Sequence, residues 1–163
     1  MIIAARTGQG KTLCFGIPIL DICIRKIEKF YEKSNPDDSK YMFPGAVGLI
    51  LSPTRELAIQ IKDMIEAVIP VQYQETIKVS ALVGGMSIQK QQRLLSYNPA
   101  IIVATPGRLW ELMNDQNEAY LLNTLPMVDV LVLDEADRMI ADGHFKEMKD
   151  ILAHIYIQRL QQK

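Results

Sequence analysis

The chain has 163 residues and a formal net charge of -1, with 48% hydrophobic and 23% charged residues. This length suits one globular domain, and the composition excludes a mainly disordered chain. The longest apolar stretch, residues 46–51, is far shorter than the ~18 residues that span a bilayer, and residues 1–5 are too short for a signal-peptide core. We therefore expect a cytosolic or nuclear protein, and any binding of nucleic acid must come from local groups rather than from a broad positive field.

Runs rich in aliphatic and β-branched residues predict strands at 2–5, 46–52, 77–83, 100–104 and 128–133. Helical periodicity predicts helices at 11–31, 55–69, 88–96, 106–114 and 145–160. This alternation indicates an α/β fold with a parallel sheet. Because the strands are continuously apolar, we expect helices on both faces and burial of both faces. Residues 32–45 lack periodicity and are predicted as a surface loop.

The two cysteines, Cys14 and Cys23, lie in one predicted helix. Nine residues at ~1.5 Å each place their backbones ~13 Å apart, which is too far for a disulfide, so we expect two buried free thiols. The only histidines, His144 and His154, have no Cys or His at metal-binding spacing. We therefore expect no metal site built from side chains alone.

Residues 5–12, ARTGQGKT, follow a predicted strand and open a predicted helix, which is the context of a phosphate-binding loop. Gly8 and Gly10 would supply the unusual backbone angles, while backbone amides and the helix N-terminus supply positive potential. We expect Lys11 to reach the β- and γ-phosphates and Thr12 to place its hydroxyl on Mg²⁺. The strict pattern begins with Gly where this one begins with Ala, and a chance Gly-Lys-Thr at a helix start is the alternative.

A second half of the same site is predicted where the apolar run 130–133 ends in Asp134 and Glu135. Carboxylates at the carboxyl end of a parallel strand lie where α/β sheets bind ligands. Asp134 would hold the Mg²⁺ shell, and Glu135 would orient and deprotonate an attacking water. The alternative is an acidic cluster favoured by the dipole of a following helix. Two matching halves in one short chain favour the nucleotide site.

Taken together, these two motifs resemble those of a known family. Residues 5–12 are similar to the A-x-T-G-x-G-K-T loop of superfamily 2 helicases, and residues 134–137 spell the DEAD motif that names the DEAD-box RNA helicases. Three more motifs follow in family order: PTRELA at 53–58, GG at 84–85 and TPGRL at 105–109. The resemblance implies the first RecA-like P-loop domain of an ATP-dependent RNA helicase, a hydrolase that uses ATP and Mg²⁺ to separate RNA strands.

The resemblance also implies roles for individual residues. The nucleotide-binding residues would be Thr7, Gly8, Gln9, Gly10, Lys11 and Thr12. The catalytic residues would be Lys11, Asp134 and Glu135, and Thr12 and Asp134 would hold the metal. The RNA-binding residues would be Pro53, Thr54, Arg55, Gly84, Gly85, Thr105, Pro106, Gly107 and Arg108.

The RNA motifs also make physical sense by themselves. Arg55 begins a predicted helix, and Thr105 is a plausible N-cap with Pro106 at the first helical position, so each helix start can receive a phosphate. Gly84 and Gly85 would let backbone amides approach a sugar-phosphate chain. Contacts of this kind carry no base identity, so we expect single-stranded RNA to be bound without sequence preference. For any one motif alone, a helix cap or tight turn is the favoured alternative.

Finer features resemble the nucleolar subgroup of large-ribosomal-subunit assembly: WEL at 110–112, RM at 138–139 and GHF at 143–145. They imply a role in ribosome biogenesis and a place in the nucleolus or nucleus, otherwise the cytoplasm. Trp110 is predicted to be a packing aromatic. The Gln-rich run at 89–93 is predicted to be a solvated helix face.

Parts of the family pattern are not found in the sequence. The adenine-reading motif would precede the first strand, and the Ser-Ala-Thr motif and the second RecA-like domain with its arginine fingers would follow the last helix. We therefore expect residues 1–163 to form a single partial domain, truncated at both ends, with weak base discrimination, near-background hydrolysis and a sheet that lacks a central strand. A non-catalytic interaction or decoy protein remains the alternative, while an unrelated P-loop ATPase would leave the RNA motifs unexplained.

Overall fold

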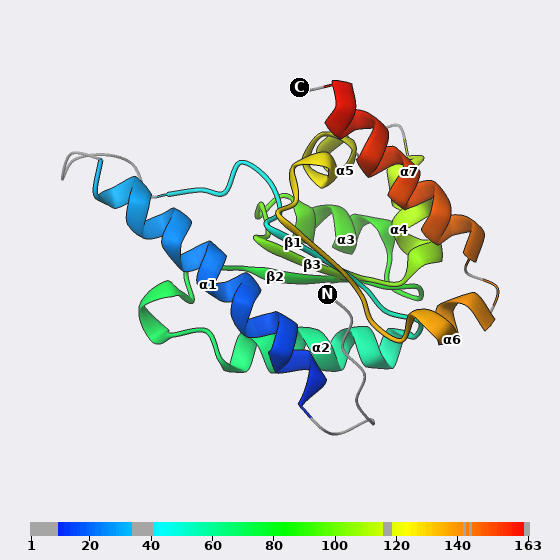
Figure 1. Ribbon diagram of the computed structural model, residues 1–163, viewed down its shortest axis with the longest axis horizontal. Coiled ribbons are helices and arrows are strands. Elements are labelled where there is room, and N and C mark those ends of the chain that lie inside the picture. The colour runs from blue at the N-terminus through cyan, green and yellow to red at the C-terminus, as the bar shows by residue number, and fades with distance from the viewer. Residues whose placement is uncertain (1–9, 34–40, 116–118, 142, 144, 162–163) are drawn as a thin grey trace.

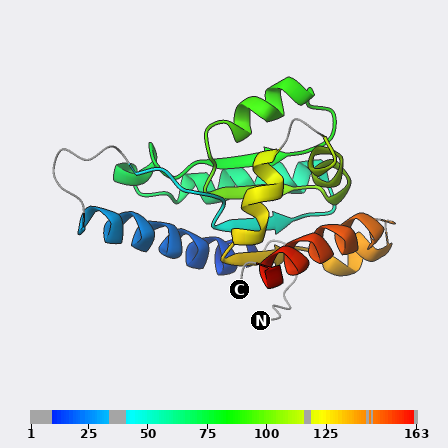
Figure 2. The same ribbon diagram turned by 90° about the horizontal axis from the view of Figure 1, so that it is seen from above.

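A computed structural model describes residues 10–33, 41–115, 119–141, 143 and 145–161 of the chain. Figures 1 and 2 show a central sheet with helices on either side. Among the described residues, no helix is long and apolar enough to cross a membrane.

The sheet has strands β1 (Gly48–Leu51), β2 (Val79–Leu82), β3 (Ile101–Ala104) and β4 (Val130–Leu133). All three pairings are parallel, and the order is β2-β3-β1-β4. The predicted parallel α/β sheet is therefore confirmed for these strands. The predicted strand at 2–5 lies outside the described residues.

The helices cover both faces of the sheet, as predicted. One face is covered by α1 (Lys11–Tyr31) and α2 (Arg55–Ala67), and the other by α4 (Pro106–Met113), α5 (Ala119–Thr124) and α7 (Phe145–Gln161). In Figure 1, α2 lies below the sheet, α1 runs from below it to the upper left, and α5 and α7 lie above it. The remaining helices are α3 (Ile88–Leu95), which contacts β2, and α6 (Ala136–Ala141), together with the 3-10 turns η1 (Val71–Tyr73) and η2 (Leu125–Met127).

Two hydrophobic clusters, one on each side of the sheet, form the core. Along β1, Ile50 belongs to the cluster under α1 and α2, whereas Leu49 and Leu51 belong to the cluster under α4, α5 and α7. This alternation follows from the pleat, which sends successive side chains to opposite faces. The continuous apolar run therefore reflects a strand that is covered on both sides. At Gly48, an added Cβ would lie 2.8 Å from Ile19 Cγ2, so this glycine lets α1 pack closely against β1.

Strand β4 does not follow the prediction that both strand faces are buried. Leu131 and Leu133 are 37% and 36% exposed, whereas every residue of β1, β2 and β3 is buried. Within the described part of the chain, β4 pairs only with β1 and forms one edge of the sheet. An edge strand has one neighbour instead of two, and this leaves its leucines in partial contact with water.

The loop and the short helices also differ from expectation. The predicted surface loop at 32–45 contains the buried Phe43, whose ring lies 4.9 Å from the Tyr41 ring. The sequence did not predict α5 and α6, because six residues are fewer than two turns and show no clear period. Both cysteines are free, but only Cys23 is buried and Cys14 is exposed, so the expectation of two buried thiols was wrong for Cys14.

Candidate functional site

The predicted motifs follow the carboxyl ends of the four strands. Residues 52–55 follow β1, residues 83–86 follow β2, residues 105–108 follow β3, and Asp134 and Glu135 follow β4. Because the strands are parallel, all four segments lie at the same edge of the sheet. This is the edge at which open α/β sheets bind their ligands.

The N-terminus of α1 also belongs to the candidate site. Its N-cap is Gly10, with a φ of 76°, and no side chain caps the helix among the described residues. Gly10 is exposed and has open space where a Cβ would lie. The amides of the first turn can therefore receive an anion. The other predicted loop residues, Thr7, Gly8 and Gln9, lie outside the described residues.

Lys11 and Asp134, 123 positions apart in sequence, influence each other in the fold. Burial raises the pKa of Asp134 above its ordinary value, while the positive charge of Lys11 acts to lower that pKa. The neighbouring Glu135 carboxylate also raises the pKa of Asp134, and the Glu135 backbone N–H, which donates to the Asp134 carboxylate, lowers it. The structure therefore brings the two halves of the predicted nucleotide site together, with the partly buried Thr12 next to Lys11 on α1.

Glu135 adopts an uncommon backbone conformation. Its φ of 49° is in the left-handed region, which non-glycine residues occupy at a cost of about 1–3 kcal/mol. Its carboxylate lies 3.4 Å from Arg138 Nη1. Strained backbone of this kind is concentrated at functional sites, and the catalytic role of this residue stays a prediction.

Arg55 and Gly85, from two different predicted RNA motifs, are in direct contact. A Cβ added to Gly85 would lie 2.5 Å from Arg55 Nη1 and 2.8 Å from Cζ. Gly85 also has a φ of 78°, which favours glycine. The guanidinium therefore lies against a backbone that no side chain shields. The paired Gly84 has open space around it and no positive φ.

Arg108, from the third RNA motif, is held by several hydrogen bonds. It donates from Nε to Gln91 Oε1 at 3.2 Å, from Nη2 to the Met86 carbonyl at 3.3 Å, and from Nη1 to Glu111 Oε2 at 2.8 Å. Only 13% of the Arg108 side chain is exposed. The segment after β2 and the segment after β3 are thus tied together.

The two helix starts in the RNA motifs differ in their capping. Thr54 caps α2, because its hydroxyl accepts from the Leu57 amide at 3.3 Å. Thr105 occupies the N-cap of α4 without a side-chain hydrogen bond, and Pro106 follows at the first position. The α4 amides that begin at Gly107 have no side-chain cap and can receive a phosphate.

Sequence reasoning missed Gln91. The run at 89–93 was predicted to be solvated, but Gln91 is fully buried and takes part in the Arg108 network. Its position was readable from the helical spacing, since Gln91 lies four residues before the buried Leu95 and on the same face of α3. By contrast, Trp110 packs, as predicted, against the hydrophobic cluster under α4, α5 and α7. His144 lies outside the described residues.

Two further features lie in or near this region. The Ser52 hydroxyl, directly after β1, is fully buried and has no hydrogen-bond partner within the described residues. No pattern in the sequence points to it. No group of three His, Cys, Asp or Glu residues that could hold a metal occurs in the part of the chain that the structure describes.

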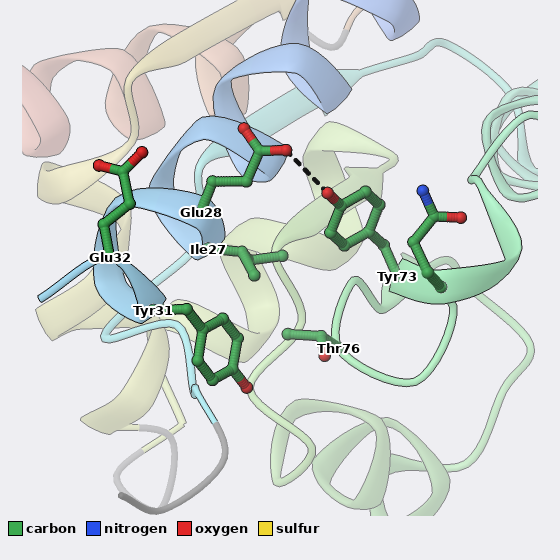
Figure 3. Close-up of a pocket in the computed structure, with 7 residues that line it drawn as sticks. Ile27, Glu28, Tyr31, Glu32, Tyr73 and Thr76 are labelled. Carbon is green, nitrogen blue, oxygen red and sulfur yellow. Dashed lines mark hydrogen bonds between the residues drawn. The ribbon is translucent and has the colours of Figure 1, made fainter. Parts of the chain in front are cut away.

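A separate pocket of about 490 Å³ lies at the other end of α1 (Figure 3). Glu28 and Tyr31 from α1 and Glu32 just after it line the pocket together with Tyr73, whose hydroxyl donates to Glu28 Oε1 at 2.8 Å. None of the predicted site residues lines this pocket. It is therefore distinct from the candidate site at the carboxyl edge of the sheet.

Comparison with known proteins decides the family. The sequence model described as DEAD/DEAH box helicase matches residues 1–163. The chain belongs to the DEAD/DEAH box helicase family. It is 47% identical over 148 residues to the ATP-dependent RNA helicase MAK5 of Candida albicans and 45% identical over 156 residues to the DEAD-box ATP-dependent RNA helicase 13 of Arabidopsis thaliana. These matches cover 91% and 93% of this DEAD-box chain but 18% of each relative, so the chain spans about a fifth of their length.

Solved structures of DEAD-box proteins have the same fold. The yeast DEAD-box splicing factor Prp28 matches with a TM-score of 0.74 and 35% identity, over 94% of this chain and 32% of that one. The DEAD-box helicase Mss116 bound to ssRNA and UDP-BeF matches with a TM-score of 0.70 and 32% identity, over 93% of this chain and 27% of that one. The predicted RecA-like fold class and the membership in a family of ATP-dependent RNA helicases are confirmed.

Proposed function

We propose that residues 1–163 form a single partial domain, the ATP- and RNA-binding first RecA-like domain of a DEAD-box helicase that couples ATP hydrolysis to RNA strand separation. The observation that carries the proposal is the arrangement at the carboxyl edge of the sheet. There the ends of β1, β2 and β3 carry the three RNA motifs, while β4 carries the DEAD motif beside Lys11.

On the nucleotide side, the first-turn amides of α1 and the Lys11 ammonium bind phosphate oxygens, together with the loop residues Thr7, Gly8, Gln9 and Gly10. The donor set fits Mg²⁺, because the Thr12 hydroxyl and the Asp134 carboxylate are hard oxygen ligands. Burial and the neighbouring Glu135 carboxylate both disfavour the charged form of Asp134, so a cation would stabilise it. When bound, Mg²⁺ neutralises charge on the phosphates. Glu135 orients and deprotonates the attacking water.

On the RNA side, Arg55 and Arg108 donate charge-assisted hydrogen bonds to phosphates. The segments Pro53–Thr54, Gly84–Gly85 and Thr105–Gly107 contribute backbone amides and helix starts. These donors read the sugar-phosphate chain and not the bases, so the ligand is single-stranded RNA, or a duplex being opened, of any sequence.

We further propose a role in ribosome biogenesis, in the nucleolus or nucleus. The support is the set of subgroup features in the sequence, WEL at 110–112, RM at 138–139 and GHF at 143–145. Several of the similar relatives are named MAK5, which agrees with one subgroup.

Calorimetry with Mg²⁺-ATP tests the nucleotide half of the proposal. Lys11→Ala should remove measurable binding, because the variant lacks the cation that meets the phosphates. The matched control is Lys29→Ala, which removes a lysine from the exposed last turn of the same helix and should leave binding unchanged. Equal heats for the wild-type chain and Lys11→Ala would refute the nucleotide site and favour a non-catalytic interaction or decoy protein.

A further inference from the structure

We propose that Gln91 is a positioning residue for the RNA-binding surface. In this role, its side-chain amide sets both the backbone turn after β2 and the direction of the Arg108 guanidinium. The inference rests on the proposed RNA-binding function and adds to it a residue that lies in none of the family motifs. Gln91 does not itself meet RNA, because it is fully buried.

The hydrogen bonds around Gln91 define its orientation. Nε2 donates to the Val83 carbonyl at 3.2 Å and to the Met86 carbonyl at 3.0 Å, while Oε1 accepts from Arg108 Nε at 3.2 Å. Two carbonyls require the amide NH₂, and a guanidinium requires the amide oxygen, so only one orientation satisfies all three partners. The amide therefore bridges two chain segments in one defined geometry.

The first segment is the turn that contains the paired glycines. Val83 and Met86 flank Gly84 and Gly85, and one NH₂ group holds the carbonyls on both sides. Gly85 is in the left-handed region and lies against the Arg55 guanidinium. By closing the turn, Gln91 keeps Gly85 where Arg55 can lie over it.

The second segment is the start of α4. Arg108 has five N–H donors in a rigid plane, and Gln91, Met86 and Glu111 take three of them. The two remaining donors have a direction fixed by those three bonds. Preorganisation of this kind reduces the cost of ordering a long side chain when a phosphate binds.

Glutamine is the residue that meets both demands. Glutamate keeps an acceptor for Arg108 but has no donor for the two carbonyls. Methionine is about as long as glutamine but has neither the amide donor nor the amide acceptor. Either change leaves the Val83 carbonyl without the donor from residue 91 and leaves the Met86 carbonyl with Arg108 Nη2 alone. A buried carbonyl that loses its donor is costly, so either change should release the turn.

The experiment compares Gln91→Met and Gln91→Glu with Gln89→Met and Gln89→Glu in the same chain. Gln89 is exposed on the same helix, so the controls match composition and charge. The probes are oligouridine, followed by fluorescence anisotropy at low salt, and Mg²⁺-ATP, followed by calorimetry. We expect both Gln91 variants to weaken oligouridine binding about tenfold, the scale of one lost hydrogen bond, with Mg²⁺-ATP affinity unchanged. The Gln89→Met control should bind as the wild type does, and Gln89→Glu should show only a small charge effect.

A second readout reports the turn without any ligand. Hydrogen exchange at the amides of residues 84–87 should speed up in the Gln91 variants and stay at the wild-type rate in the Gln89 variants. In an Arg108→Ala background, Gln91→Met should cost less affinity than in the wild-type background, because the two residues act through one network.

The outcomes separate this inference from the proposed function. Unchanged oligouridine affinity and unchanged exchange in both Gln91 variants, beside a loss of affinity in Arg108→Ala, would overturn the positioning role alone. A wild-type chain that binds Mg²⁺-ATP but no oligouridine would overturn the RNA-binding function, and the positioning role for RNA with it. If Gln91→Met lowers the thermal midpoint too far to be measured, Gln91→Glu decides the matter, because it keeps the partner of Arg108.

Discussion

The RNA half and the nucleotide half of the candidate site differ in how much of each is held together by protein contacts. In the RNA half, Arg108 has three hydrogen-bond partners, Arg55 lies against Gly85, and Thr54 caps its own helix. In the nucleotide half, no side chain caps α1 among the described residues, and Asp134 is partly buried beside Lys11. The difference teaches that the proposed RNA-binding residues are already held by protein contacts, whereas the described groups of the proposed nucleotide site have fewer protein partners.

Reversing the two arginine charges should have the largest effect. Arg55→Glu combined with Arg108→Glu should lower single-stranded RNA affinity by at least roughly 100-fold, since two charge-assisted hydrogen bonds are lost and two repulsive carboxylates are gained. Fluorescence anisotropy at low salt measures the change. Arg25→Glu with Lys29→Glu makes the same change in net charge on exposed positions of α1 and should have a much smaller effect. Equal losses in both pairs would mean that overall charge, and not this surface, binds RNA.

The two glycines of the GG motif should separate stability from binding. Gly85→Ala should destabilise the chain by about 1–3 kcal/mol, because its φ is positive and the new Cβ would meet Arg55. Gly84→Ala should keep the thermal midpoint, because its Cβ would enter open space, but should weaken RNA binding if the backbone approaches the ligand there. Chemical denaturation and anisotropy measure the two effects. Equal stability losses at both positions would show that the turn differs from the one described.

Asp134→Asn should raise the thermal midpoint at neutral pH. This effect should be smaller than the previous two, and a gain would mean that the aspartate lowers the stability of the chain. Burial raises the pKa of Asp134 in the folded chain, so the stability that protonation contributes is present at low pH and is lost as pH rises through the folded-state pKa. Asparagine cannot ionise and avoids this loss. The gain should shrink toward acidic pH, where the aspartate is protonated in both states. A lower midpoint for Asp134→Asn at neutral pH would contradict the assigned burial.

The smallest expected effect is a difference in reactivity between the two thiols, and it does not involve ligand binding. Burial raises the pKa of the Cys23 thiol to about 12, so it stays protonated and shielded, whereas Cys14 is exposed. A thiol reagent at neutral pH should therefore label one cysteine per chain in the folded state and two after denaturation. Mass spectrometry of the labelled chain counts them. Fast labelling of Cys23 would show that α1 is not packed against the sheet as described.

The sequence predicted the parts of the fold that depend on long patterns. The residues 11–31 show a helical period over several turns, and α1 has those bounds. Strands β1, β2 and β3 were predicted because a strand that is covered on both faces is largely apolar. Strand β4 has the same composition, but its exposure depends on its neighbours in the sheet, which composition does not encode.

Each motif of the candidate site was predicted from the sequence by itself. The contacts between different motifs were not predicted. Glycine-rich and acidic motifs carry their chemistry in consecutive residues, so Lys11 and Asp134 were recognised in the sequence. The contact between Arg55 and Gly85 depends on the order of β2, β3 and β1, which the sequence does not state. Gln91 was missed because polar residues are usually exposed, and only the tertiary fold supplies its three partners.

The most direct test of the two-part site is a crossed titration. Mg²⁺-ATP and single-stranded RNA are each titrated against the wild-type chain, Lys11→Ala and the double variant Arg55→Glu with Arg108→Glu. We predict that Lys11→Ala loses nucleotide and keeps its RNA affinity, and that the double variant loses RNA and keeps nucleotide. Loss of both ligands in both variants, with thermal midpoints unchanged, would contradict the account of two separately built halves at one edge of the sheet.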